Sequence, residues 1–125
     1  MKHLFLFSIL FALMTNAMGA QADSPYRHVV LFKFKDDAPA DKVVEVEKAF
    51  MALKGKIPLI QQVEWGKNVS PEGLDNGFTH CFFVTFKNKA DLEKYLPHPE
   101  HQAFVELLKP QLDRVLVVDY VARAD

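Results

Sequence analysis

Cysteine is nearly absent from this sequence, and glycine-rich loops, an excess of positive charge and long apolar runs are also missing. Cys81 is the only cysteine among 125 residues, which excludes an intramolecular disulfide. Lys and Arg number 15 against 16 Asp and Glu, so no basic surplus favours nucleic acid as a partner. No phosphate-binding loop or nucleophile elbow occurs. Any chemistry must therefore rest on a few side chains.

The longest apolar run, Leu4 to Met14, lies near the N-terminus and is too short to span a bilayer, which needs about 20 residues. Lys2 precedes this run and small residues follow it, which is typical of a cleavable secretory signal peptide over residues 1–22. The sequence thus predicts a secreted or periplasmic protein without membrane association after cleavage. Residues 23–125 are expected to form one domain.

Hydrophobic periodicity in the rest of the chain predicts four strands and two helical segments. The strands are expected at Tyr26–Phe34, Ile60–Lys67, Thr79–Phe86 and Val115–Val121, with the second at a sheet edge because it is more polar. The helices are expected from Pro39 to about Ile57 and from Asn88 to about Leu108, the latter kinked at Pro97–Pro99. This order, βαββαβ, predicts an α+β ferredoxin-like antiparallel sheet with the helices on one face.

The central strands carry apolar residues on both faces. In the first strand, Val30 and Phe32 alternate with Val29 and Leu31. Two helices can cover only one face of a sheet, so the other face needs a partner. The simplest partner is a second copy, which gives a homodimer with a barrel-like core between the two sheets.

The segment from Tyr95 to His101 holds the most distinctive polar pattern. Pro99 suits the first position of a helix, so His98 is expected to cap that helix and His101 to lie in its first turn. His101 shares a helix face with Phe104, and Tyr95 lies on a similar stripe, so both rings should point towards the core. They are either core residues satisfied by hydrogen bonds or an acid–base pair at the wall of an apolar pocket.

Two other histidines are weaker candidates. His28, on the helix-facing side of the first strand, is either a polar group lining a pocket or a satisfied residue at the start of the strand. His80 lies at the opposite end of the third strand and is expected to have a structural role. A metal site built from His98 and His101 is a further alternative, although no Cys or acidic ligand set accompanies them at a recognisable spacing.

Five segments carry one further pattern: Arg27–Asp36, Trp65–Ser70, Gly77–His80, His98–His101 with Phe104, and Val115–Tyr120. In this order they resemble the stress-responsive dimeric α/β-barrel (Dabb) family over essentially the whole predicted domain. The resemblance implies a homodimeric ferredoxin-like α+β barrel, in agreement with the hydrophobic pattern.

One plant member of that family is a polyketide cyclase that needs no cofactor, and its catalytic tyrosine and histidine match Tyr95 and His101. In such chemistry the histidine removes a proton alpha to a carbonyl, and the tyrosine hydroxyl stabilises the enolate. Phe50 stands where the cyclase has a tyrosine, which implies a different and smaller pocket. The residues expected to line the pocket are His28, Val30, Phe32, Val46, Phe50, Phe82 and Phe104.

Some plant members also hold a magnesium ion on backbone carbonyls at the end of the first helix. The matching positions are Lys54, Ile57 and Ile60, and no cofactor is otherwise expected. The leading functional hypothesis is binding of a small, largely apolar molecule between helices and sheet. The alternatives are a cyclase or isomerase with His101 as base and Tyr95 as hydrogen-bond donor, and a structural stress protein without a ligand. Whether the protein is an enzyme stays open.

Overall fold

The computed structural model describes residues 24–125, so the predicted signal peptide lies outside the described residues. Along the chain the elements are β1 (Tyr26–Phe34), α1 (Ala40–Lys56), β2 (Ile60–Lys67), β3 (His80–Phe86), α2 (Lys89–Tyr95), α3 (Pro99–Leu108), the 3₁₀ turn η2 (Lys109–Gln111) and β4 (Leu112–Val121). Among these residues no helix is both long and apolar enough to cross a membrane.

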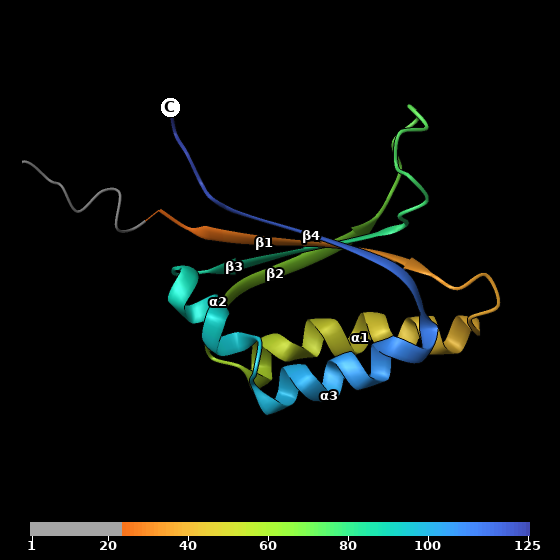
Figure 1. Cartoon of the computed structure of the whole chain (residues 1–125), viewed down its shortest axis with the longest axis horizontal. Helices are drawn as coiled ribbons and strands as arrows, with labels where there is room; N and C mark the ends of the chain where they lie inside the picture. The colour runs from red at the N-terminus through yellow and green to blue at the C-terminus, as the bar shows by residue number, and fades with distance from the viewer. Residues whose placement is uncertain (1–23) are drawn as a thin grey trace, which may run out of the picture.

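The four strands form one antiparallel sheet in the order β2-β3-β1-β4, and the helices lie on one of its faces (Figure 1). This confirms the predicted ferredoxin-like α+β fold and the edge position of β2. The bounds of β1 and β2 are also as predicted. β4 begins three residues earlier than expected, at Leu112, after a register shift between Lys33 and Phe34 of its neighbour β1.

Helix α1 follows directly from its sequence. Pro39 precedes it, Asp41 lies in its first turn, and Lys54 and Lys56 lie in its last turn, which is the charge order that the helix dipole favours. Its apolar face buries Val46, Phe50 and Leu53 against the sheet. The helix ends at Lys56, just before the extended Ile57 and Pro58.

The second helical segment divides into two helices rather than one kinked helix. Asn88 caps α2 by accepting the N–H of Asp91 at 2.9 Å, and His98 caps α3 through its Nδ1, which accepts the N–H of Glu100 at 3.1 Å. Pro97 and Pro99 lack the backbone donors that a continuous helix would use. The break therefore places Tyr95 at the end of one helix and His101 in the first turn of the next.

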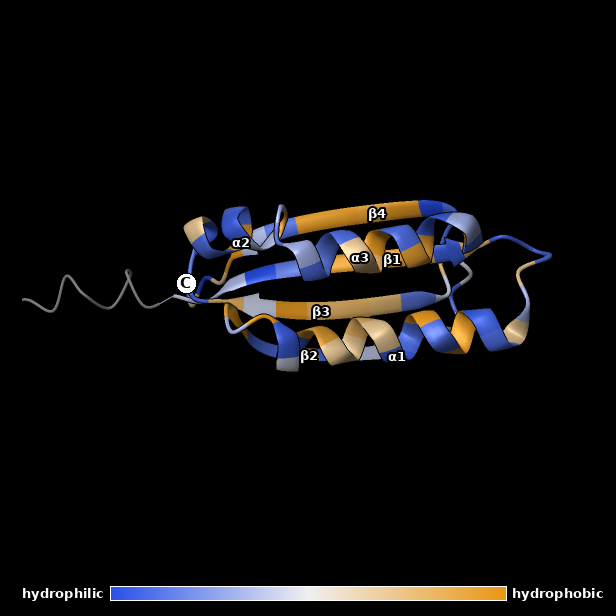
Figure 2. Cartoon of the chain, turned by 90° about the horizontal axis from the view of Figure 1, so that it is seen from below, coloured by the Kyte–Doolittle hydropathy of each residue, from blue (hydrophilic) through white to orange (hydrophobic). Residues whose placement is uncertain are grey.

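The core lies between the helices and the inner face of the sheet, where the alternate residues of β1 and β3 are buried. The outer face has no helix, and β4 is exposed along most of its length. Figure 2 shows that hydrophobic residues nonetheless run along both β3 and β4. The predicted apolar outer face is therefore present and uncovered in the single chain.

Candidate functional site

Tyr95, His101 and His28 come together at one end of the helix–sheet layer. The Tyr95 ring lies between the two imidazoles, with ring centroids 4.4 Å from His101 and 6.1 Å from His28. The three side chains come from α2, α3 and β1, so the site depends on the whole fold. The sequence pattern identified these three residues as candidates, and the structure places them side by side.

The hydrogen bonding of His101 fixes its tautomer. Its Nδ1 lies 2.8 Å from the backbone carbonyl of Leu96, and because a carbonyl can only accept, Nδ1 must carry the proton. In the neutral ring, Nε2 then keeps its lone pair. Burial lowers the pKa of His101 from its ordinary value of 6.5, while the Leu96 carbonyl opposes that shift. At neutral pH the imidazole is therefore a neutral base with Nε2 as its basic atom.

The hydroxyl of Tyr95 has no hydrogen-bond partner among residues 24–125. The residue is only 1 % exposed, and burial alone raises the pKa of its phenol. Because no fully buried side-chain polar atom in the described part of the chain lacks a partner, this hydroxyl must reach the small exposed area that remains. The ring of the half-buried His101 lies beside the Tyr95 ring. The phenol of Tyr95 therefore stays protonated at neutral pH beside the neutral imidazole of His101.

His28 is held by an acidic residue that the sequence analysis did not single out. Asp119 on β4 lies opposite His28 in the sheet and binds its Nδ1 at 2.6 Å, while the hydroxyl of Tyr26 donates to the same carboxylate at 3.2 Å. The pairing orients the His28 ring, which also meets Phe86 edge-on at 6.2 Å. His28 is thus both satisfied by a hydrogen bond and adjacent to Tyr95.

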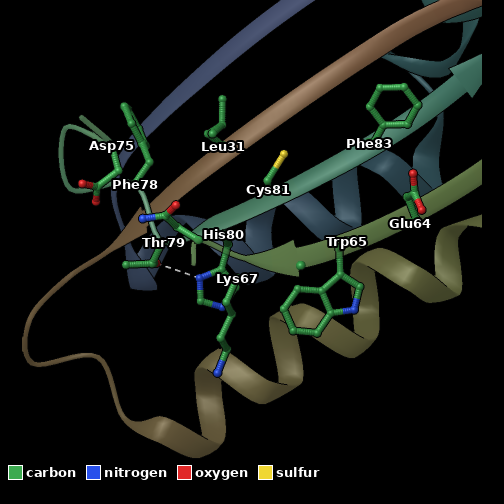
Figure 3. A pocket seen from close by; sticks show the side chains of 12 residues that line it. Leu31, Glu64, Trp65, Lys67, Asp75, Phe78, Thr79, His80, Cys81 and Phe83 are labelled. Carbon is green, nitrogen blue, oxygen red and sulfur yellow. Dashed lines mark hydrogen bonds between the residues drawn. The ribbon is translucent and has the colours of Figure 1, made fainter. Parts of the chain in front are cut away.

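A second polar cluster lies at the other end of β3. His80 binds the carboxylate of Glu47 at 2.9 Å through Nε2 and the hydroxyl of Thr79 at 2.8 Å through Nδ1. Trp65 stacks on the His80 ring at 5.6 Å with the planes 3° apart (Figure 3). The expected structural role of His80 fits this geometry, with Glu47 and Thr79 as its partners. Glu47 was missed because it lies beside, not within, the apolar stripe of α1.

The apolar residues predicted to line the pocket form the packed core. The members of this set are all buried, and their rings touch: Phe50 stacks on Phe82 at 4.0 Å and meets Phe104 at 5.0 Å. Phe32 of β1 packs against Phe82 of the neighbouring strand β3, with ring centroids 5.5 Å apart. Much of the space between helices and sheet is thereby filled by side chains. The remaining members, Val30 and Val46, belong to the same cluster.

A cavity of about 540 Å³ lies elsewhere, under the loop of residues 68–79 (Figure 3). Leu31, Cys81 and Phe83 on the outer face of the sheet contribute to it, together with Phe78 of the loop. Burial raises the pKa of the Cys81 thiol, with a smaller contribution from Glu64, so the thiol stays protonated and weakly reactive. A separate groove of about 300 Å³ runs between α1 and α3 past Phe104.

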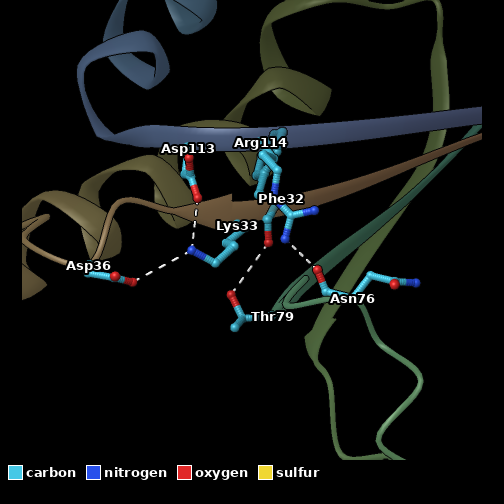
Figure 4. Close-up of polar contacts among 7 residues, drawn as sticks. All are labelled: Phe32, Lys33, Asp36, Asn76, Thr79, Asp113 and Arg114. Carbon is cyan, nitrogen blue, oxygen red and sulfur yellow. Dashed lines mark hydrogen bonds and ion pairs between the residues drawn. The ribbon is translucent and has the colours of Figure 1, made fainter.

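Polar contacts hold that loop against the sheet (Figure 4). Arg114 of β4 donates to the backbone carbonyl of Asn76, and its guanidinium lies 5.0 Å from the centre of the Phe78 ring. Gly77 follows with a positive φ of 82°, which a residue with a side chain adopts only with strain. On the neighbouring strand, Lys33 binds Asp113 at 2.8 Å. The loop therefore has a defined position relative to β4.

No cluster of three or more His, Cys, Asp or Glu side chains suited to a metal ion occurs within residues 24–125. The predicted magnesium positions lie in the turn from α1 to β2, where the carbonyl of Ile57 accepts the N–H of Ile60 at 3.1 Å. Carbonyls at a helix C-terminus attract a cation, whereas the ammonium groups of Lys54 and Lys56 in the same turn oppose one. Magnesium at this turn stays a prediction.

Comparison with known proteins gives a consistent result. Residues 26–122 match the family model of the stress responsive A/B barrel domain, Dabb. The chain is 39 % identical over 100 residues to the stress-response A/B barrel domain-containing protein HS1 of Arabidopsis thaliana, covering 80 % of this chain and 92 % of that protein. It is 31 % identical over 97 residues to olivetolic acid cyclase of Cannabis sativa, covering 78 % and 96 %.

Among solved structures, a dimeric protein of unknown function with a ferredoxin-like fold from Bacteroides fragilis superimposes with a TM-score of 0.65. It is 31 % identical in sequence, and the match covers 79 % of this chain and 97 % of that one.

Proposed function

The chain belongs to the stress-responsive A/B barrel (Dabb) family, and we propose that it binds a small, largely apolar molecule at the end of the helix–sheet layer formed by Tyr95, His101 and His28. The hydroxyl of Tyr95, which has no hydrogen-bond partner among residues 24–125, carries this proposal. The phenol is almost wholly buried, so a ligand that supplies an acceptor would form a hydrogen bond that the described part of the chain does not provide. Aromatic core residues next to the hydroxyl favour a ligand with an apolar body.

Native mass spectrometry of the purified protein tests this proposal, because it detects small molecules that remain bound. Tyr95→Phe is the informative variant, since it removes one oxygen from a group without a protein partner and should leave the fold stable. Gln102→Ala, an exposed change on α3, is the matched control. A co-purifying molecule that the control retains and Tyr95→Phe loses is the expected result. Equal retention by both variants would place the ligand elsewhere, and an empty protein in every preparation would count against binding.

We propose an acid–base enzyme as the second candidate, on the strength of the His101 tautomer. A neutral imidazole with Nδ1 held by a carbonyl presents Nε2 as a base, and the adjacent phenol can donate a hydrogen bond to an enolate oxygen. Olivetolic acid cyclase, whose name describes a ring-closing enzyme, shows that the family includes catalysts. A substrate with a carbonyl group and an acidic proton beside it would suit both residues.

Exchange of the methyl protons of acetophenone for deuterium, followed by NMR, measures this step without the natural substrate. A general base contributes about 10²–10⁴-fold, so His101→Ala should reduce protein-dependent exchange by at least about 100-fold. Tyr95→Phe should reduce it as well, and Gln102→Ala should not. Exchange that is the same with and without protein would remove the support for this candidate while leaving ligand binding untouched.

We further propose that the protein is a homodimer, because its outer sheet face is apolar and uncovered and because its structural relative from Bacteroides fragilis is dimeric. Light scattering at several protein concentrations tests this directly. A particle with the mass of a single chain at all concentrations would refute it.

Export is also proposed, from the sequence pattern of residues 1–22 alone. N-terminal sequencing of the protein recovered from its native host tests it, since cleavage should leave a chain that begins near residue 23. A chain that still begins at Met1 would be inconsistent with a cleaved signal peptide.

A further inference from the structure

Large apolar side chains that remain exposed in the single chain fall mainly into two groups. One group is β4, where six apolar residues are each exposed by about half: Val115, Leu116, Val117, Val118, Tyr120 and Val121. The other is the loop of residues 68–79, where Val69 is 92 % and Leu74 is 74 % exposed. Exposed apolar patches of this kind mark interaction sites. Two sheets packed face to face would bury only part of these two patches.

The register of β4 with β1 shows which residues of β4 would stay exposed if two sheets packed face to face. Val118 lies opposite Val29 and faces the open side of the sheet, where a second copy would cover it. Val117 lies opposite the buried Val30 and faces the helix side, yet it is 48 % exposed against 49 % for Val118. Stacking two sheets on their open faces would leave Val117 in water.

The loop is placed to reach that second surface. It leaves the ends of β2 and β3 and rises on the side of the sheet opposite the helices, which is the side where a second copy would lie (Figure 1). Because β2 and β4 are the two edges of the sheet, a two-fold axis along the strands sets β2 of one copy over β4 of the other. Only that orientation brings the loop of one copy to the apolar edge of its partner.

We infer that, in the homodimer proposed above, the 68–79 loop of each copy wraps over the edge of the partner's β4 and covers its helix-side residues with Val69 and Leu74. Two such contacts form by symmetry, and each strand β4 is then covered on both faces. The contact also borders the polar site, because Asp119 follows Val117 by two residues on the same face of β4. The partner's loop therefore forms part of the surroundings of the Asp119–His28 pair.

Thiol labelling tests this contact with a matched pair of probes. Cysteine is introduced as Val117→Cys or Val118→Cys in a Cys81→Ala background, and the rate of maleimide modification is measured from dilute to concentrated protein. Val44→Cys on α1 serves as the exposed control, since Val44 is 43 % exposed and lies on a helix rather than in the sheet. The same probes are then measured with the loop changes Val69→Asp and Leu74→Asp, which alter exposed side chains and should leave each chain folded.

Both probes on β4 should become at least about tenfold slower to label as the dimer forms, and the loop changes should restore labelling at position 117 only. Protection of position 118 alone would overturn this inference and leave the homodimer intact. Protection of position 117 that persists with the altered loop would assign the cover to another segment, which also overturns it. Unchanged labelling at both positions would refute the homodimer itself.

Discussion

The buried pair of Glu47 and His80 allows the sharpest prediction about stability. Glu47 and His80 side chains are 10 % and 6 % exposed, and the carboxylate is the partner of the imidazole Nε2–H. Glu47→Leu introduces an apolar side chain of similar size in α1 and leaves that N–H without an acceptor. Removing one member of a buried pair costs about 3–5 kcal/mol, and an orphaned neutral donor costs about 1–3 kcal/mol. We therefore expect a loss of about 3 kcal/mol.

Two further variants separate the hydrogen bond from the packing. Glu47→Gln retains an acceptor and loses only the charge assistance, which should cost about 1 kcal/mol. The double variant Glu47→Leu with His80→Leu removes both polar groups and should recover to within about 1 kcal/mol of the parent protein. Glu45→Leu is the control, because Glu45 is exposed on the same helix and its ion pair with Lys42 contributes at most about 1 kcal/mol.

Urea unfolding at one fixed protein concentration measures these differences, since the midpoint reports stability when the slope is unchanged and a dimer makes stability depend on concentration. A loss of less than about 1 kcal/mol in the free energy of unfolding of Glu47→Leu would contradict this prediction. A double variant as unstable as Glu47→Leu alone would contradict it as well.

Three other outcomes follow from single residues. Phe50→Ala should cost about 3–5 kcal/mol in urea unfolding because Phe50 stacks on Phe82 and meets Phe104 edge-on in the core. Val44→Ala on the exposed face of α1 should change stability by less than about 0.5 kcal/mol. NMR titration should give His101 a pKa below 6.5. Because the folded pKa lies below the unfolded one, the contribution of His101 to the free energy of unfolding is complete above pH 6.5 and is lost as the pH falls through the folded pKa. A His101→Gln variant should therefore lose less stability on acidification. Gly77→Ala should destabilise by about 1–3 kcal/mol, since φ is positive there and a Cβ would lie 2.9 Å from the Arg114 guanidinium; calorimetry that shows an unchanged melting temperature would contradict this.

The fold could be predicted because its signals are local. Alternating apolar residues delimit β1 to the residue, and the more polar β2 was also predicted with the bounds that the structure has. Asn88 and His98 were recognisable as caps from their place before a helical pattern. The break between α2 and α3 was misjudged as a kink, because two prolines near each other are compatible with either arrangement. The three rings of the candidate site were predicted for the same local reason, since periodicity shows which way each of them points.

Long-range pairing explains what the sequence did not reveal. Glu47 and His80 are 33 residues apart, and Asp119 is 91 residues from His28, so neither pair leaves a trace in local spacing. A carboxylate next to an apolar stripe is usually solvated, and only the partner across the fold makes its burial favourable. The same limit applies to the predicted pocket lining. Periodicity placed Phe50 and Phe82 on the inner side, but it carries no information on whether inward-facing rings leave a gap or touch.

Strand β4 contributes both to the proposed ligand site and to the proposed contact between the two copies. This strand holds Asp119, which orients His28, and it is also the strand with the most exposed apolar surface. A substitution that separates the two copies should therefore alter the site although it changes no site residue. Asp119 would become more exposed to water, and its hydrogen bond to His28 would weaken in the more polar environment. A change at Tyr95, which is buried on the helix side of the sheet, should leave assembly on the outer face unaffected. If assembly and ligand retention respond independently to Val118→Asp and Tyr95→Phe, the site is complete within one chain. If Val118→Asp abolishes both, the dimer is the functional unit.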